Sequence, residues 1–298
     1  MRVSLKPIDE QVMVVFGASS GIGRATALLA AERGARVVAA GRDREALTTL
    51  AADAAPGDVT IGVADAADHA EVEAIAELAV STHGRIDTWA HVAGVAEYAR
   101  FEDMTPEEFR RVIDVDLLGP VNGARAALPQ LRRNGGAYVV VSSEVAKRGL
   151  PLLSSYSAAK HGVDGFVEAL RVELQHAGAP VSVVQILPGP VATPFFENAR
   201  SRLGVRASGP PPVYGPEKVA EAILTSAQEL RRDVVVGRAT KARLVIQRIS
   251  PRLLDAVTRV AAFPLLRSKD QRAPGEDAVF ERPHREDRVR GVVSNTHR

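Results

Sequence analysis

A tyrosine and a lysine four positions apart are the side chains in this sequence best placed to move a proton. Tyr156 and Lys160 lie in an apolar stretch with a helical pattern, and residues four apart share one face of a helix. A phenol titrates near ~10 when unperturbed, so it needs a nearby cation to act as an acid or base near neutral pH. Lys160 is placed to be that cation. The pair alone could be two ordinary helix residues, but Ser142 and Ser143, at the end of an expected strand thirteen residues before Tyr156, strengthen the catalytic interpretation.

A glycine-rich loop near the N-terminus has the composition of an anion-binding turn. Its candidate binding residues, between an expected strand and an expected helix, are Gly17, Ser19, Ser20, Gly21, Ile22 and Gly23. Glycines let the backbone turn tightly and let a pyrophosphate approach the helix N-terminus, whose free N–H groups favour anions. The alternative is a generic glycine turn. Its position in the first strand–helix unit favours dinucleotide binding.

The elements that must position these residues alternate between apolar strands and helices. Strands are expected at residues 12–16, 35–40, 59–63, 87–92, 137–142, 181–187 and 234–237. Helices are expected at residues 24–33, 44–52, 70–82, 106–131 with a break near Gly119, 156–177 and 217–230. Strands this apolar are buried on both faces, which indicates parallel strands with helices above and below. The sequence therefore predicts an α/β fold: a doubly wound, Rossmann-type parallel sheet of about seven strands, in a single domain with a C-terminal helical extension.

The glycine spacing G-x-x-x-G-x-G, together with the serines, Tyr156 and Lys160, resembles the short-chain dehydrogenase/reductase (SDR) family over roughly residues 8–240. The resemblance implies that Ser143 holds the substrate oxygen and that Tyr156 donates or takes the proton. It also implies that Lys160 binds the nicotinamide ribose. Hydride then moves directly to or from the nicotinamide, and the protein contributes position and electrostatics.

Two further segments match positions at which the family binds its cofactor. The segment after the sixth strand resembles the part that packs against the nicotinamide carboxamide, and it contains Pro188, Gly189, Val191 and Thr193. A plain turn after a strand is the alternative. Asp65, after the third strand, matches the position beside the adenine, although an Asp there could equally stand at a helix N-terminus.

The sequence departs from the family pattern in two places. His91-Val92-Ala93-Gly94 stands where the family has N-N-A-G. Ala93 and Gly94 are the part that lets the cofactor approach, so binding should survive, and His91 is expected to serve in packing. The family's helix asparagine, which holds a water in a proton relay, falls on Asp116. A carboxylate can also hold that water, so we expect an altered pH dependence rather than loss of activity.

The end of the second strand indicates which nicotinamide dinucleotide is used. An enzyme that uses NAD usually places Asp or Glu there to bond the ribose hydroxyls, whereas this chain has Gly41 followed by Arg42. A guanidinium binds a phosphate in bidentate fashion, so Arg42 is interpreted as the ligand of a 2′-phosphate and the expected cofactor is NADP(H). Ser19 could add a hydroxyl. The neighbouring Asp43 and a merely solvated Arg42 are the arguments for NAD.

Composition excludes several other classes of protein. The 298 residues are 46% hydrophobic and 25% charged with a net charge of +2, which suits a soluble globular protein and not a nucleic-acid binder. The absence of cysteine excludes disulfides, thiolate metal sites and Cys nucleophiles, and no metal site is expected. No signal peptide or spanning apolar run is apparent, so a cytoplasmic location is expected.

The last sixty residues or so, 241–298, form a basic amphipathic extension and a charged tail beyond the catalytic domain of residues 1–240. Residues 204–216 are expected to be a loop or lid, and residues 231–272 contain eleven Lys and Arg against three Asp. A helix is expected from Ser250 to Pro264, with an apolar face formed by Leu253, Leu254, Val257, Val260 and Ala261. We favour docking of this face on its own domain or on a second subunit. A membrane-surface helix is the alternative.

The sequence thus predicts an NADP(H)-dependent oxidoreductase that interconverts a ketone or aldehyde with an alcohol. Asp116 would support the proton relay. An apolar lining, and hence a hydrophobic substrate, is indicated by Gly149, Leu150, Leu152, Leu153, Phe195 and Phe196. The family resemblance implies a homodimer or homotetramer. The alternative function is a non-catalytic dinucleotide-binding module that senses redox state or serves as a scaffold.

Overall fold

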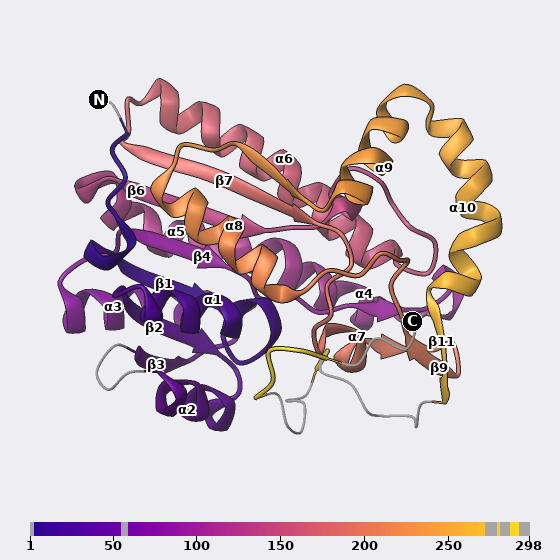
Figure 1. Cartoon of the computed structure of the whole chain (residues 1–298), viewed down its shortest axis with the longest axis horizontal. Coiled ribbons are helices and arrows are strands. Elements are labelled where there is room, and N and C mark those ends of the chain that lie inside the picture. The colour runs from indigo at the N-terminus through magenta and orange to yellow at the C-terminus, as the bar shows by residue number, and fades with distance from the viewer. Residues whose placement is uncertain (1–2, 55–58, 272–278, 281–286, 292–298) are drawn as a thin grey trace.

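A seven-stranded parallel sheet forms the centre of the computed structural model, which describes residues 3–54, 59–271, 279–280 and 287–291 (Figure 1). Its strand order is β10-β7-β6-β4-β1-β2-β3. The strands are β1 (Val12–Phe16), β2 (Arg36–Gly41), β3 (Val59–Val63), β4 (Thr88–His91), β6 (Gly136–Val141), β7 (Val181–Pro188) and β10 (Asp233–Val236). The predicted doubly wound sheet is confirmed, and each strand lies within one residue of its expected bounds.

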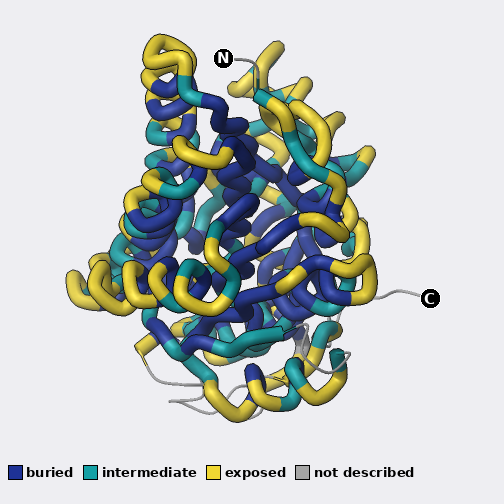
Figure 2. Tube along the Cα trace, turned by 90° about the vertical axis from the view of Figure 1, so that its left-hand side faces the viewer, coloured by how far each residue is buried: buried dark blue, intermediate teal, exposed yellow. Residues whose placement is uncertain are grey.

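Helices cover both faces of this sheet and bury its side chains. One face carries α1 (Gly21–Glu32), α2 (Arg44–Asp53) and α8 (Pro216–Gln228). The other carries α3 (His69–His83), α4 (Pro106–Ile113), α5 (Gly119–Asn134) and α6 (Ser154–His176). Figure 2 shows the strands as a dark blue centre enclosed by helices with exposed outer faces. Because the strands are buried on both faces, their sequences are uninterrupted runs of apolar residues.

The helix expected over residues 106–131 is not interrupted near Gly119. Instead a π-helical turn, Asp114–Leu118, joins α4 to α5, and the Gly119 N–H donates to the Asp114 carbonyl. Pro120 lacks the N–H that an α-helix would direct at the carbonyl of Asp116, so the α pattern cannot run unchanged through this point. The wider turn accommodates the proline and keeps the chain helical.

Short strands outside the main sheet were missing from the prediction. The expected loop 204–216 begins with β9 (Val205–Ala207), which pairs antiparallel with β11 (Arg267–Gln271). β5 (Glu97–Tyr98) pairs with β8 (Arg200–Ser201), just after the short helix α7 (Phe195–Asn198). These pairings join segments far apart in the sequence, and two to five residues carry too little periodicity to reveal them.

The C-terminal extension folds as a helical hairpin of α9 (Arg238–Ile249) and α10 (Pro251–Leu265) at one end of the molecule (Figure 1). Leu253, Val257 and Val260 of the expected apolar face are 58%, 52% and 72% exposed, so for these three residues the expected docking on the chain's own domain is wrong. Leu254 and Ala261 of the same face are half-buried. In the described part of the chain, no helix combines the length and the apolar character needed to cross a bilayer. The division near residue 240 and docking on a second subunit stay predictions.

Candidate functional site

The carboxyl ends of the parallel strands meet at one edge of the sheet, where the chain order reverses. β1 lies between β2 and β4, so successive strands lead away from it in opposite directions. In open α/β sheets, ligands bind in the crevice at such a switch point. Two cavities open there, and they share residues at their boundary.

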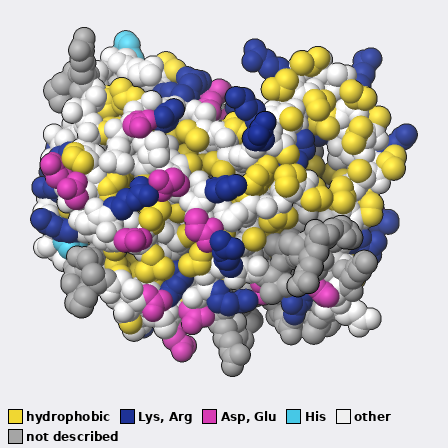
Figure 3. All heavy atoms as spheres, in the orientation of Figure 1, with side chains coloured by type: hydrophobic (Ala, Val, Ile, Leu, Met, Phe, Trp, Pro, Cys, Tyr) yellow, Lys and Arg dark blue, Asp and Glu magenta, His cyan; other side chains and the backbone are white. Residues whose placement is uncertain are grey.

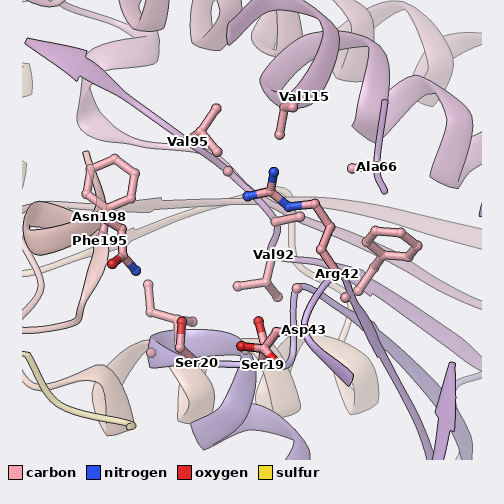
Figure 4. Close-up of a pocket in the computed structure, with 18 of the residues that line it drawn as sticks. Ser19, Ser20, Arg42, Asp43, Ala66, Val92, Val95, Val115, Phe195 and Asn198 are labelled. Atoms are coloured by element: carbon pink, nitrogen blue, oxygen red, sulfur yellow. The ribbon is translucent and has the colours of Figure 1, made fainter. Parts of the chain in front are cut away.

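The first of these, the glycine-loop cavity, gathers most residues proposed from the sequence to bind a dinucleotide. Figure 4 shows Arg42 extending into it while Ser19 and Ser20 border it from the loop. The sequence-predicted residues that line it are Gly17, Ser19, Ser20, Gly21, Ile22, Gly23, Arg42, Asp65, Ala93, Gly94 and Thr193. Val95, Val115 and Asn198 also line it and were not predicted.

Close backbone packing explains the glycines of this loop. A Cβ on Gly17 would lie 2.4 Å from the backbone N of Ala93, and one on Gly23 would lie 1.9 Å from the carbonyl oxygen of Gly17. No other residue type fits at either position without moving the backbone. Ser20 occupies the N-cap position of α1 but makes no capping hydrogen bond with its side chain. The first turn of α1 therefore lines the cavity without a side-chain cap, as an anion-binding helix N-terminus requires.

The acidic residues beside Arg42 are already engaged within the protein. The Asp43 side chain caps α2 by accepting the Ala46 N–H at 3.1 Å. Asp65 accepts hydrogen bonds from Arg111 at 2.5 Å and from the Ala67 N–H at 3.0 Å. Burial raises the pKa of Asp65, but these bonds outweigh it and the net shift is downward. Asp65 is not the cap of α3, because Asp68 fills that position.

The second cavity, the Tyr156 cavity, contains the expected catalytic side chains. The sequence-predicted residues that line it are Ile22, Gly94, Ser143, Tyr156, Lys160, Pro188, Gly189, Val191 and Thr193. Because Ile22, Gly94 and Thr193 also line the glycine-loop cavity, the two cavities are contiguous. A ligand extending from the glycine loop would therefore reach the side chain of Tyr156.

The lining of the Tyr156 cavity is largely apolar. Leu150, Leu153, Phe195 and Phe196 line it as expected, whereas Gly149 and Leu152 are not among its lining residues. Tyr98, Val145 and Leu266 also line it and were missed by sequence reasoning. Leu266 follows α10, so the extension contributes a wall that no motif could have signalled.

Tyr156, Ser143 and Lys160 come from two elements that meet at this cavity. Ser143 is the second residue after the end of β6, and Tyr156 and Lys160 stand one turn apart on α6. The Lys160 ammonium lies 5.4 Å from the centre of the Tyr156 ring. Burial and the charge of Asp116 raise the pKa of Tyr156 above its usual value, against the lowering effect of a hydrogen bond with Ser143. Tyr156 therefore keeps its proton at neutral pH.

Asp116 contacts Lys160 and lines neither cavity. Its carboxylate is fully buried, 3.1 Å from the Lys160 ammonium, and accepts the Val95 N–H at 3.2 Å. Burial raises the pKa of Asp116, and the lysine opposes that shift. A Cβ on Gly94 would lie 2.6 Å from the carboxylate, so glycine is required where the chain passes over it. Asp116 is placed to position Lys160.

His91 has a packing role, as expected from the sequence. Its ring stacks on Phe16 with centroids 5.3 Å apart, and the residue is buried beneath the sheet edge. Burial and the positive charge of Lys160 lower the pKa of His91 to about 3. The imidazole is therefore neutral at physiological pH and is not among the residues that line either cavity.

A second buried carboxylate, Glu97, lies beside the Tyr156 cavity and was not predicted. Burial and the neighbouring Glu108 raise the pKa of Glu97 to about 8. Arg202 contacts both carboxylates, at 3.4 Å from Glu97 and 2.6 Å from Glu108. This cluster ties β5 and β8 to α4 and thereby holds Tyr98, the residue after Glu97, in the cavity wall.

A segment of the C-terminal tail, residues 287–291, contacts the glycine loop. The Arg288 carbonyl accepts the N–H of Gly21, the first residue of α1, at 2.9 Å. The segment is held by ion pairs from Arg288 to Glu197 and from Arg290 to Glu217, at 2.8 and 2.9 Å. An anion bound at this N-terminus would have to displace the Arg288 carbonyl or bind beside it.

The helical extension is attached to the domain beside the Tyr156 cavity. Arg243 of α9 forms a bidentate contact with Glu144, the residue after Ser143, with both N–O distances at 2.8 Å. The start of α9 also packs against the segment after β7: a Cβ on Gly189 would lie 2.2 Å from the Thr240 hydroxyl oxygen. The extension therefore supports the loop that carries Ser143 and the segment that lines the Tyr156 cavity.

Comparison with known proteins agrees with this architecture. Residues 11–204 match the family model described as short chain dehydrogenase. The Bacillus subtilis protein called uncharacterized oxidoreductase YxnA is 39% identical over 284 residues, which cover 94% of this chain and 80% of that protein. The 3-oxoacyl-[acyl-carrier-protein] reductase FabG of Thermotoga maritima is 34% identical, over 74% of this chain and 92% of its own. The chain belongs to the short-chain dehydrogenase family of oxidoreductases.

Solved structures with the same fold include complexes with either nicotinamide dinucleotide. A short chain dehydrogenase from Burkholderia cenocepacia in complex with NADP superposes with a TM-score of 0.72 at 28% identity, over 85% of this chain and 99% of that one. One from Burkholderia phymatum in complex with NAD gives 0.74 at 25% identity, over 84% and 97%. Similarity at this level therefore does not select between the two dinucleotides.

The Arg243–Glu144 contact yields a prediction about stability. Replacing Arg243 with Gln leaves a largely buried carboxylate with weaker partners, and we expect unfolding in urea to be easier by about 1–3 kcal/mol. As a control, Arg33→Gln breaks the exposed pair with Glu221 and should change the free energy of unfolding by less than about 1 kcal/mol. Equal effects of the two substitutions would show that the extension is not fastened through Arg243.

Proposed function

We propose that this protein is an NADP(H)-dependent oxidoreductase that interconverts a hydrophobic ketone or aldehyde with the corresponding alcohol. The observation that carries the proposal is the meeting of Ser143, Tyr156 and Lys160 in a cavity contiguous with the glycine-loop cavity. A phenol, a hydroxyl and an ammonium lie there close to the N-terminus of α1, which has no side-chain cap and whose first N–H donates to the Arg288 carbonyl. The membership in the short-chain dehydrogenase family supports the same reaction class.

The glycine-loop cavity has the properties that a dinucleotide requires. The first turn of α1 would offer N–H groups to a pyrophosphate, and Asp65, which lines the cavity, would flank the adenine. Ala93 and Gly94 let a ligand approach the backbone after β4, and Lys160 would bind the nicotinamide ribose. The segment with Pro188, Gly189, Val191 and Thr193 would flank the nicotinamide.

Arg42 favours NADP(H) over NAD(H). Its guanidinium extends into the cavity (Figure 4), whereas Asp43, the next residue, caps α2 and Asp65 accepts a hydrogen bond from Arg111. A guanidinium can bind a 2′-phosphate through two hydrogen bonds, and the Ser19 hydroxyl lies on the same side of the cavity. One similar solved structure is a complex with NADP and another is a complex with NAD. The proposed preference for NADP(H) therefore rests on the side chains of this chain.

In the proposed reaction, side chains of the protein supply the proton that the substrate oxygen gains. The chemistry that a bound nicotinamide supplies is hydride transfer to or from the carbonyl carbon. Ser143 would orient the substrate oxygen, and Tyr156, which keeps its proton at neutral pH, would donate it to that oxygen during reduction. Lys160 would stabilise the phenolate that remains, and Asp116 would keep the ammonium in place. In the direction of alcohol oxidation, the same phenol must first lose its proton.

The lining of the Tyr156 cavity bears on the substrate class and on the alternative function. The apolar wall formed by Leu150, Leu153, Phe195 and Phe196 favours a hydrophobic substrate. The alternative of a non-catalytic binding module is not favoured, because the three catalytic side chains are present and adjacent. A homodimer or homotetramer and a cytoplasmic location stay predictions. Among the described residues no cluster of potential metal ligands occurs.

The Tyr156→Phe variant tests the proposed reaction directly. Removing the hydroxyl leaves the ring but deletes the proton donor, so NADPH oxidation with ketones, aldehydes, quinones and ketosteroids should fall by about 100-fold or more. Absorbance of NADPH follows the reaction, and fluorescence of bound NADPH verifies that the cofactor still binds. Wild-type binding of NADPH without turnover of any compound, in either direction, would instead support a binding module.

The Arg42→Ala variant tests the cofactor preference. Losing a charged hydrogen-bond partner of the 2′-phosphate should weaken NADPH binding by about 10- to 100-fold and leave NADH binding nearly unchanged. Titration calorimetry with both dinucleotides measures the difference in affinity. The control is the Arg44→Ala variant, which removes an exposed arginine two residues further along the chain. Equal losses for the two dinucleotides would refute the assignment of Arg42.

The Asp116→Asn variant tests the electrostatic role of the buried carboxylate. The negative charge of Asp116 raises the pKa of Tyr156, so removing it should lower that pKa. The rise of alcohol oxidation with pH, and the alkaline decline of carbonyl reduction, should both move to lower pH by about one unit or more. Profiles of kcat/KM against pH measure the shift, with the exposed Asp103→Asn as control. An unchanged profile or a shift to higher pH would contradict this role.

A further inference from the structure

The helical hairpin of the extension presents an exposed apolar surface. Val257 and Val260 stand four and seven residues after Leu253, so α10 carries them as one stripe, and all three are exposed. On α9 the apolar residues Val245, Ile246 and Ile249 are also exposed, and Ile249 stands four and three residues after the other two. Figure 3 shows hydrophobic side chains gathered over this end of the molecule. We call these six residues the hairpin crest.

Basic side chains surround the hairpin crest. The exposed arginines and lysine of the two helices are Arg238, Lys241, Arg248, Arg252 and Arg259. In the sequence of residues 238–265 the one acid is Asp255, and it pairs with Arg148 of the catalytic domain at 2.6 Å. Figure 3 shows Lys and Arg at the edge of this apolar region. The surface as a whole is therefore apolar at its centre and positively charged at its margin.

The hairpin is held so that the crest faces outward. Arg148 contacts both helices, through Gln247 of α9 at 3.4 Å and Asp255 of α10 at 2.6 Å. Arg243 fastens α9 to Glu144 on the side turned toward the domain. The end of α10 packs through Ala262 and Leu266 into the apolar cluster with Tyr98 and Phe196. Polar contacts and the packing of Ala262 and Leu266 thus hold the inner side of the hairpin against the domain, while the residues of the hairpin crest remain exposed.

We propose that the hairpin crest docks on the surface of an anionic lipid bilayer. Apolar side chains of an interfacial helix insert at the boundary between headgroups and acyl chains, and flanking Lys and Arg attract acidic headgroups. The stems of Arg252 and Arg259 can lie along the apolar surface while their guanidinium groups reach phosphates. The exposure of Leu253, Val257 and Val260 thus favours the alternative that seemed weaker from the sequence alone.

Charge argues for a lipid surface rather than for a second copy of this chain. Two hairpin crests pressed together would bring five exposed basic side chains of each copy into proximity, and Asp255 is already paired with Arg148. An anionic bilayer complements this margin with charge of the opposite sign. Apolar residues of both helices then leave water without like-charge repulsion.

Docking would also bring the Tyr156 cavity near the bilayer. Leu266, directly after α10, lines that cavity, so the crest and the substrate wall share one structural unit. A hydrophobic substrate held in the bilayer would then have a short path to Tyr156. The docking proposal itself does not depend on the proposed reaction, because membrane binding is measured without substrate or cofactor.

Vesicle flotation of the full chain tests the docking. The protein should float with vesicles of phosphatidylcholine mixed with phosphatidylglycerol, should bind phosphatidylcholine alone much more weakly, and should be released as salt increases. The double variant L253E/V257E should lose at least about tenfold in affinity, because it places charges in the crest. Replacing both Arg252 and Arg259 with Gln should weaken binding by roughly fivefold for each charge removed.

A matched control separates the crest from exposed apolar residues in general. Val172 and Leu230 are 62% and 64% exposed outside the hairpin, so V172E/L230E should bind vesicles as the unchanged chain does. Thermal melting by circular dichroism verifies that every variant is folded. Absence of binding to anionic vesicles, or binding that L253E/V257E leaves intact, would overturn the proposal. A solution dimer that L253E/V257E dissociates, without any vesicle binding, would assign the crest to a second copy and likewise overturn it.

Discussion

In a wholly parallel sheet every strand ends at the same edge, and the rest of this structure depends on that constraint. Hydrogen bonding along β10-β7-β6-β4-β1-β2-β3 places the residues that follow β1, β2, β4, β6 and β7 side by side. The glycine loop, Arg42, Gly94, Ser143 and Gly189 come from five separate parts of the chain, yet all of them line one continuous crevice. Helices on both faces bury the strands and make the edge rigid.

Within that crevice, one buried ion pair determines the electrostatics. The Lys160 ammonium lies 3.1 Å from the Asp116 carboxylate and 5.4 Å from the centre of the Tyr156 ring. Burial and the Asp116 carboxylate together raise the pKa of Tyr156, and burial and the Lys160 ammonium together lower the pKa of His91. The π-helical turn that brings Asp116 to this position follows from Pro120, which cannot donate a hydrogen bond in an α-helix. A backbone constraint thereby sets the position of the carboxylate that contacts Lys160.

The C-terminal extension contributes to the same site instead of forming a separate appendage. Arg243 and Arg148 connect it to the segment after β6, and Leu266 completes the apolar wall of the Tyr156 cavity. The tail segment 287–291 reaches the glycine loop as well, through the carbonyl of Arg288. Both ends of the crevice are therefore bordered by residues from beyond the part of the chain that matches the family model.

The sequence by itself determined the sheet, the glycine loop and the pairing of Tyr156 with Lys160 on one helix face. Apolar strand runs, the helix spacing of Tyr156 and Lys160, and the glycines are local patterns with local physical causes, so each could be predicted from neighbouring residues. Only the tertiary structure decided what Asp116 contacts, which acids are engaged beside Arg42, and that β9 pairs with β11. It also decided that Leu253, Val257 and Val260 face outward, although their helical spacing was evident beforehand. Periodicity shows that a helix has an apolar face, but what covers that face depends on contacts between residues distant in the sequence, which no local pattern encodes.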